Sequence, residues 1–316
     1  MAIFLQDKKR MKLFTAGMLL SGILLGQTPE QDEGPAAVFR SDSRLVQLHV
    51  TVTDPEGHLI TNLPQSAFHV YENDAQQQIS VFRQEDAPIS LGVIIDNSAS
   101  MREKRDRVNA AALDLVRASN PQDEVFIMSF SDAPAIVQDF TRNRESMENA
   151  LAKAEPSGAT AMRDAVLMAI EHVRRLGQED KKSVLVVTDG EDNASMTTLD
   201  RVVRAAQNYG ILVYAVGLLA DETERAAKRA RSDLDAITLA TGGEAFYPKN
   251  VAEVDEIAKH VAHDLRNQYT IAYTPSDDRQ DGSYRAIRVD VSVPGAIATT
   301  RSGYYAPDSN LTSAAH

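Results

Sequence analysis

A nearly unbroken apolar run, from Ile89 to Ile95, ends in the carboxylate of Asp96 and is followed by the hydroxyls of Ser98 and Ser100. Such a run is typical of a strand covered on both faces, as in parallel sheets. The polar residues then fall at the carboxyl end of the strand, where open α/β sheets form binding crevices. Three oxygen side chains at alternate positions can converge on one Mg²⁺ or Mn²⁺ ion. The same residues also suit a helix cap, because a helical pattern starts just after Ser100, so both interpretations remain open locally.

The region from 87 to 267 alternates apolar strands with segments of helical periodicity. A second buried strand, starting at Ser183, again ends in a carboxylate, that of Asp189. Apolar spacing predicts a helix around Asp233 to Ala240 and a last helix with an apolar stripe from Val251 to Leu265. This alternation predicts an α/β fold, a doubly wound and mostly parallel sheet with helices on both faces.

On both sides of that region, apolar and polar residues alternate with the period of two that is typical of strands. Alternation from Leu45 to Thr53 predicts a half-buried strand, and further short strands with turns predict an antiparallel β unit over 44–86. Strands over 268–305 are expected to complete this unit, which makes the β domain discontinuous and the α/β domain an insertion in it. The imidazoles scattered over the first strands are interpreted as structural, and these are His49, His58 and His69.

The two ends of the chain carry different signals. Basic residues precede an apolar stretch from Leu13 to Gly26, which predicts a signal peptide over 1–27. Both cleavage and retention as an N-terminal anchor fit this pattern. A flexible leader is expected over 28–43 and a disordered tail over 306–316. After cleavage we expect no stable membrane span, because no second apolar stretch of spanning length follows, and hence an exported, periplasmic or secreted protein.

Composition excludes several classes of function. The formal net charge is -12 and the pI is near 5.1, which argues against binding to a nucleic-acid backbone. The chain contains no cysteine, so disulfides, thiolate zinc sites and cysteine nucleophiles are excluded. We find no phosphate-cradling glycine-rich loop with lysine and no Gly-x-Ser-x-Gly elbow.

Three strand-to-helix loops carry oxygen side chains that are predicted to meet at one edge of the parallel sheet. The three pieces are Asp96-Asn97-Ser98-Ala99-Ser100, Gly158-Ala159-Thr160 and Thr188-Asp189-Gly190. In their order and spacing these pieces resemble a von Willebrand factor type A domain with its metal-ion-dependent adhesion site. The resemblance covers roughly residues 88 to 265, and it implies a Rossmann-like domain over 87–267.

The resemblance also implies a metal site and a partner. Its metal residues would be Asp96, Ser98, Ser100, Thr160 and Asp189. The two serines would bind Mg²⁺ or Mn²⁺ directly, the threonine directly or through water, and the two carboxylates partly through water. The sixth position would be left for a carboxylate from a protein ligand. The flanking strands resemble those of a bacterial exported group of such proteins.

The leading functional hypothesis is an exported, metal-dependent binding or adhesion module without catalysis. The alternatives are a metal-assisted hydrolase and an envelope assembly scaffold. A hydrolase needs a general base beside the ion, and the candidates are Glu191, Asp192 and His172. His260 and His263 lie one helical turn apart and are interpreted as solvated residues rather than as metal ligands.

Overall fold

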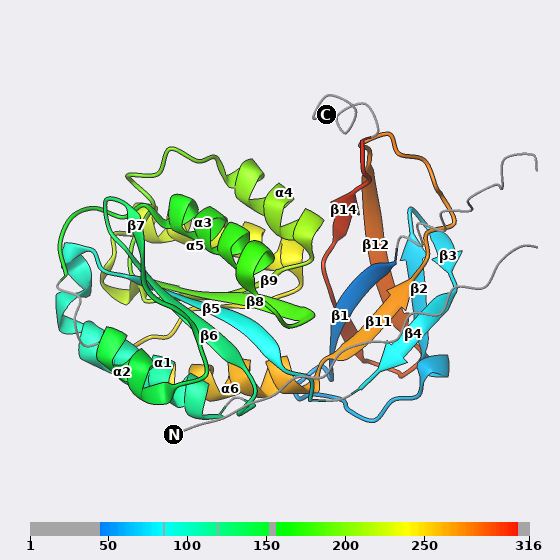
Figure 1. Ribbon diagram of the computed structural model, residues 1–316, viewed down its shortest axis with the longest axis horizontal. Coiled ribbons are helices and arrows are strands. Elements are labelled where there is room, and N and C mark those ends of the chain that lie inside the picture. The colour runs from blue at the N-terminus through cyan, green and yellow to red at the C-terminus, as the bar shows by residue number, and fades with distance from the viewer. Residues whose placement is uncertain (1–44, 85, 119, 152–155, 309–316) are drawn as a thin grey trace, which may run out of the picture. The chain divides into compact units, whose positions relative to one another are not determined.

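The computed structural model describes residues 45–84, 86–118, 120–151 and 156–308 (Figure 1). The predicted signal peptide and leader, and residues 309–316 of the predicted tail, lie outside these ranges. Within the described ranges, we find no helix with the length and apolar character needed to cross a membrane.

A six-stranded sheet, ordered β10-β9-β8-β5-β6-β7, organises the middle of the chain. Its strands are β5 (Ile89–Asp96), β6 (Glu124–Phe130), β7 (Pro134–Thr141), β8 (Lys181–Thr188), β9 (Leu212–Gly217) and β10 (Ala245–Phe246). Neighbouring strands are parallel except at one edge, where β7 runs antiparallel to β6 because only three residues connect them, too few for a crossover. The prediction of a doubly wound, mostly parallel sheet is therefore confirmed.

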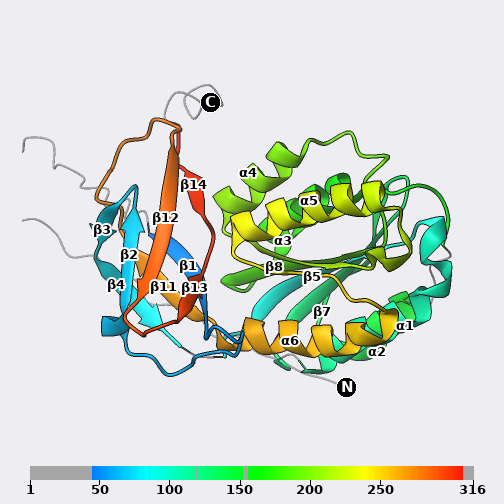
Figure 2. The same cartoon turned by 180° about the vertical axis from the view of Figure 1, so that it is seen from behind.

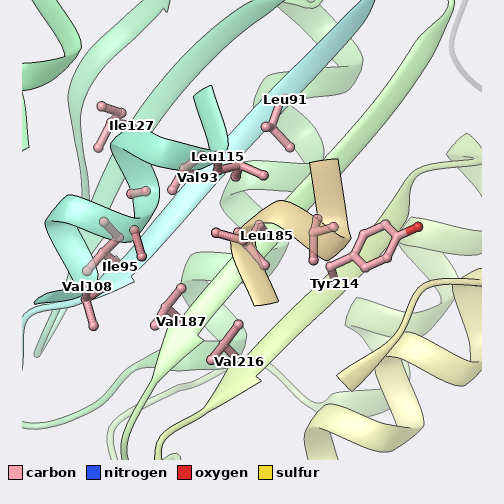
Figure 3. Close-up of a cluster of buried hydrophobic side chains, with 14 of the residues drawn as sticks. Leu91, Val93, Ile95, Val108, Leu115, Ile127, Leu185, Val187, Tyr214 and Val216 are labelled. Carbon is pink, nitrogen blue, oxygen red and sulfur yellow. The ribbon is translucent and has the colours of Figure 1, made fainter. Parts of the chain in front are cut away.

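Helices cover both faces of this sheet (Figures 1 and 2). One face carries α1 (Arg105–Ala118), α2 (Arg144–Leu151) and α6 (Val254–Asn267), and the other carries α3 (Met162–Leu176), α4 (Leu199–Tyr209) and α5 (Glu224–Thr241). Alternate residues of β5 serve the two cores: Leu91 and Val93 pack toward α1, as Figure 3 shows, whereas Ile94 belongs to the opposite cluster. Both faces of β5 are buried, which explains its continuous apolar run.

The helix expected around Asp233 begins much earlier, at Glu224. The Thr223 hydroxyl caps it by accepting a hydrogen bond from the Ala226 backbone N–H at 3.3 Å. Its first half is rich in Ala, Arg and Lys, which are strong helix formers, but it is largely exposed and has no apolar stripe. A search for hydrophobic periodicity therefore missed this half.

The flanking segments form two further four-stranded sheets, ordered β13-β1-β11-β4 and β14-β12-β2-β3. The strands before the α/β region are β1 (Val46–Thr53), β2 (Phe68–Glu72), β3 (Ala75–Gln77) and β4 (Ile79–Arg83). Those after it are β11 (Tyr269–Tyr273), β12 (Tyr284–Val291), β13 (Ile297–Thr299) and β14 (Gly303–Tyr305). One apolar core joins both sheets and includes Leu48, Val70 and Ile271, as in a sandwich.

The prediction that the first strand is only half buried is wrong. Val50 of β1 faces the sandwich core, but His49 and Thr51 on its other face are also only 8% exposed. The Gln268 amide donates to the Thr51 hydroxyl at 3.2 Å and to the Tyr214 hydroxyl of β9 at 3.1 Å. Gln268 thus links the polar face of β1 to Tyr214 of the α/β region, a contact that local periodicity does not reveal.

The first residues of the predicted tail are ordered. Ala306 is buried, and its backbone N–H donates to the Ser283 carbonyl at 2.9 Å. Asp308 forms an isolated β-bridge with Asp281. The prediction of a disordered tail therefore does not hold for residues 306–308, because the backbone there pairs with the turn before β12.

Candidate metal centre

The five predicted metal residues lie at or just beyond the ends of neighbouring strands and at the start of a helix. Asp96 is the last residue of β5, and Ser98 and Ser100 follow it, the latter within the short 3₁₀ helix η2 (Ala99–Glu103). Asp189 directly follows β8, which pairs in parallel with β5, and Thr160 lies just before α3. Parallel pairing of β5 and β8 brings their carboxyl ends to the same edge of the sheet.

Hydrogen bonds join the hydroxyls to one carboxylate. The Ser98 and Ser100 hydroxyl oxygens are 3.1 Å apart, and the Ser100 hydroxyl donates to Asp189 Oδ1 at 2.8 Å. Adjacent ligands on an octahedral Mg²⁺ with bonds of 2.0–2.1 Å lie about 3 Å apart. These separations therefore fit the edges of such an octahedron as well as ordinary hydrogen bonds.

Asp96 is fully buried and is fixed from both sides. Its Oδ1 accepts the Ser98 backbone N–H at 2.8 Å, and its Oδ2 accepts the Thr188 hydroxyl at 2.6 Å. Burial raises the pKa of Asp96, and the nearby negative charge of Asp189 adds to this effect, although the hydrogen bonds oppose it. Two buried carboxylates in one cluster favour a cation between them.

The Thr160 loop is held against both other loops. The Thr160 backbone N–H donates to Asn193 Oδ1 at 2.9 Å, and the Ala99 N–H donates to the Gly158 carbonyl at 3.3 Å. Gly158 has a φ of 82°, and a Cβ there would lie only 2.4 Å from a carboxylate oxygen of Asp132, so this turn requires glycine. A Cβ built on Gly190 would lie 3.9 Å from the Thr160 hydroxyl oxygen. The hydroxyl therefore faces the loop that carries Asp189.

Lys104 is a member of this cluster that sequence analysis missed. Its ammonium nitrogen lies 3.0 Å from Asp189 Oδ2 and 3.2 Å from Asp221 Oδ2. Burial alone would lower its pKa, but the hydrogen bonds and charges of these two carboxylates raise the pKa of Lys104 overall. It lies just after η2, and no spacing rule points to it. Its ammonium supplies positive charge next to Asp189.

The cluster borders a cavity of about 720 Å³ at the open edge of the sheet. Ser100, Lys104 and Asp189 form part of its lining. Asp221 and Lys249 also line the cavity, so its wall carries both signs of charge. A polar group of a partner therefore has space to approach the hydroxyl and carboxylate oxygens.

The three candidate general bases have other partners. Glu191 pairs with Arg229, and this hydrogen bond lowers the pKa of Glu191. Asp192 accepts the Arg163 backbone N–H at 2.7 Å and the Ser195 hydroxyl at 2.7 Å, which fixes the start of α3. His172 Nε2 lies 2.8 Å from Asp139 Oδ1, and its ring stacks on Phe140. Each of the three side chains thus has a structural role in this arrangement.

Comparison with known proteins finds a family match in the middle of the chain. Residues 91–191 match the family model of the von Willebrand factor type A domain. A solved structure of a von Willebrand factor type A protein from Catenulispora acidiphila superposes with a TM-score of 0.50, at 14% identity over 87% of this chain and 76% of that chain. At this identity the likeness shows the fold alone.

Two curated proteins are similar in sequence to part of the chain. An uncharacterized protein of Synechocystis is 28% identical over 138 residues, which are 41% of this chain and 32% of that protein. The Calcium-activated chloride channel regulator 4 of Homo sapiens is 28% identical over 169 residues, 51% of this chain and 17% of that protein. The chain thus spans about a third or less of the length of these relatives.

Proposed function

Because this chain carries a von Willebrand factor type A domain, we propose that it is a metal-dependent module that binds a protein partner. The observation that carries the proposal is the convergence of Ser98, Ser100 and Asp189 at the open edge of the sheet. Together with Asp96 and Thr160 they would hold Mg²⁺ or Mn²⁺, which oxygen-only donors favour. When bound, the ion would supply a positive centre for a carboxylate of the partner.

The protein's own residues would prepare this surface. Asp96 orients the Ser98 backbone through its Oδ1, and the Asn193 amide fixes the Thr160 loop. We propose binding without catalysis, since Glu191, Asp192 and His172 are each engaged elsewhere. We also propose that the module acts outside the cytoplasm, in the periplasm or after secretion. This rests on the basic and apolar pattern of residues 1–27.

Capture of partners from an envelope extract tests this function when variants are compared. We expect the parent protein to retain specific proteins in Mg²⁺ and to release them in EDTA. Asp189→Asn should not retain them, because the carboxylate that accepts the Ser100 hydroxyl is lost. Glu191→Gln removes the same charge two residues away, but its carboxylate faces Arg229, so this control should behave as the parent. A partner held equally in EDTA and by Asp189→Asn would refute the metal-dependent mode and favour a permanent scaffold.

Lys104 leads to a prediction in the opposite direction. Lys104→Met keeps an apolar stem of similar length but removes the positive charge 3.0 Å from Asp189 Oδ2. The Lys104 ammonium would repel a Mg²⁺ ion bound beside Asp189. Because two like charges a few ångströms apart near a protein surface repel by more than about 1 kcal/mol, we expect Mg²⁺ affinity to rise roughly tenfold. Isothermal titration calorimetry measures this. Lys249→Met, which alters a lysine lining the same cavity, should change the affinity much less. Equal or weaker Mg²⁺ binding by Lys104→Met would contradict the prediction.

A further inference from the structure

A second cluster of metal-ligating side chains lies on α6, away from the predicted Mg²⁺ site. His260 and Asp264 are four residues apart, on one face of the helix. Glu244 joins them from the segment before β10, where its carbonyl accepts the Ala215 backbone N–H at 2.9 Å. The partners of His260 are thus two carboxylates, and His263, one turn from it, is not among them.

The ligand atoms of this cluster have the separation that a small cation requires. His260 Nε2 lies 3.5 Å from Glu244 Oε2 and 3.5 Å from Asp264 Oδ2, and all three atoms lie within 4.8 Å of one another. Ligands on a tetrahedral Zn²⁺ with bonds of about 2.1 Å are about 3.4 Å apart. The Phe246 ring packs edge-on against the imidazole, with centroids 5.4 Å apart, and so restricts its orientation.

Asp264 provides an independent indication of a missing partner. The residue is only 4% exposed, and its Oδ1 is buried without a hydrogen-bond partner within the described part of the chain. The buried ammonium of Lys181 donates to the Leu265 carbonyl. Burial raises the pKa of Asp264 to about 6, an effect that the positive charges of His260 and Lys181 only partly offset. An unpaired buried carboxylate oxygen is costly, and a cation that Asp264 binds through both of its oxygens would remove that cost.

The cluster is also accessible from outside. Glu244 and His260 side chains are 54% and 42% exposed, and both line a cavity of about 520 Å³ together with Asp264, Tyr214 and Thr51. An ion can therefore enter from the cavity, and one coordination position of the ion would face the cavity.

The cluster is distinct from the predicted Mg²⁺ site. Val251, which lines the cavity beside that site, lies before the start of α6, whereas Asp264 lies in its last turn, and ten residues of α-helix span about 15 Å.

We propose that Glu244, His260 and Asp264 bind a divalent transition-metal ion of the Zn²⁺ type, with one position open to the cavity. One imidazole and two carboxylates suit Zn²⁺ better than Mg²⁺ or Ca²⁺, which prefer oxygen donors alone. The site does not depend on the proposed Mg²⁺ site, because the two share no residue.

Zn²⁺ titration of the tag-free full chain tests the proposal, with Asp189→Asn as the background so that the other site does not contribute. We expect one Zn²⁺ per chain by calorimetry. His260→Gln should weaken binding at least tenfold, and the exposed Glu244→Gln, which cannot disturb the core, should weaken it as well. Co²⁺ should give a visible absorption band that is lost in His260→Gln.

His263→Gln is the matched control, because it removes an exposed imidazole of α6 that lies three residues after His260. It should bind Zn²⁺ as the background protein does. Unchanged binding in both His260→Gln and Glu244→Gln would overturn the proposal. An equal loss in His263→Gln would also overturn it, since that would indicate nonspecific binding to surface histidines.

Discussion

Asp96→Asn should weaken Mg²⁺ binding by roughly 100-fold, the upper range for a carboxylate that supports a metal site. Asp96 is completely buried, and the Asn side chain has the same size and keeps an oxygen for the Ser98 backbone N–H. The Thr188 hydroxyl, which now donates to Asp96 Oδ2, can rotate to accept from the new amide. The substitution therefore removes the charge and preserves the shape of the site.

The same variant should not lose stability in EDTA. Burial and the charge of Asp189 both disfavour ionised Asp96 in the metal-free fold, as the raised pKa of Asp96 indicates. Neutralising the side chain should therefore leave the melting temperature unchanged or raise it, as expected where a functional site costs stability. Calorimetry with Mg²⁺ and thermal unfolding in EDTA measure the two effects.

Glu191→Gln serves as the control for charge near this site. Its carboxylate pairs with Arg229, so it should retain Mg²⁺ binding. Parent-like Mg²⁺ binding by Asp96→Asn would show that the site is misplaced. An equal loss in Glu191→Gln would show that net charge near the edge, rather than the specific cluster, attracts the ion.

The second large effect concerns stability at low pH and rests on His49. Burial lowers the pKa of His49 to about 3, and the positive charges of Lys181 and Arg301 add to this shift. In the unfolded chain the same imidazole has the ordinary pKa of 6.5. The unfolded state therefore binds the extra proton between these two values, and stability falls as pH falls through 6.5 toward 3.

From these two pKa values, His49 alone should cost about 2 kcal/mol of unfolding free energy between about pH 7.5 and about pH 5. His49→Gln removes the titrating group and keeps a polar side chain opposite Thr270. The pH-dependent loss should therefore be about 2 kcal/mol smaller in His49→Gln than in the parent. Urea unfolding at both pH values measures this difference.

His58→Gln is the control for this experiment, because His58 is an exposed histidine in the same β unit. It should lose as much stability as the parent between the two pH values. If the parent and His49→Gln lose equal stability on acidification, His49 is not buried in its neutral form.

The α/β fold and the order of the loops at the sheet edge follow from local patterns in the sequence. The run from Ile89 to Asp96 predicts a strand buried on both faces, because apolar residues at every position leave no polar face for water. Parallel strands all point their carboxyl ends to one edge. Asp96 ends one such strand and Asp189 directly follows another. These positions therefore predict that the two carboxylates lie near each other.

Which side chains from distant segments meet depends instead on tertiary packing. Lys104 reaches Asp189, His49 is buried against the α/β region, and Glu244 joins the two α6 residues His260 and Asp264. No apolar pattern indicates that β7 runs antiparallel to its neighbour. The exposed first half of α5 likewise has no apolar stripe. The physical reason is that periodicity records which face of an element is buried. The identity of the opposing residue depends on packing summed over the whole chain, which no local pattern encodes.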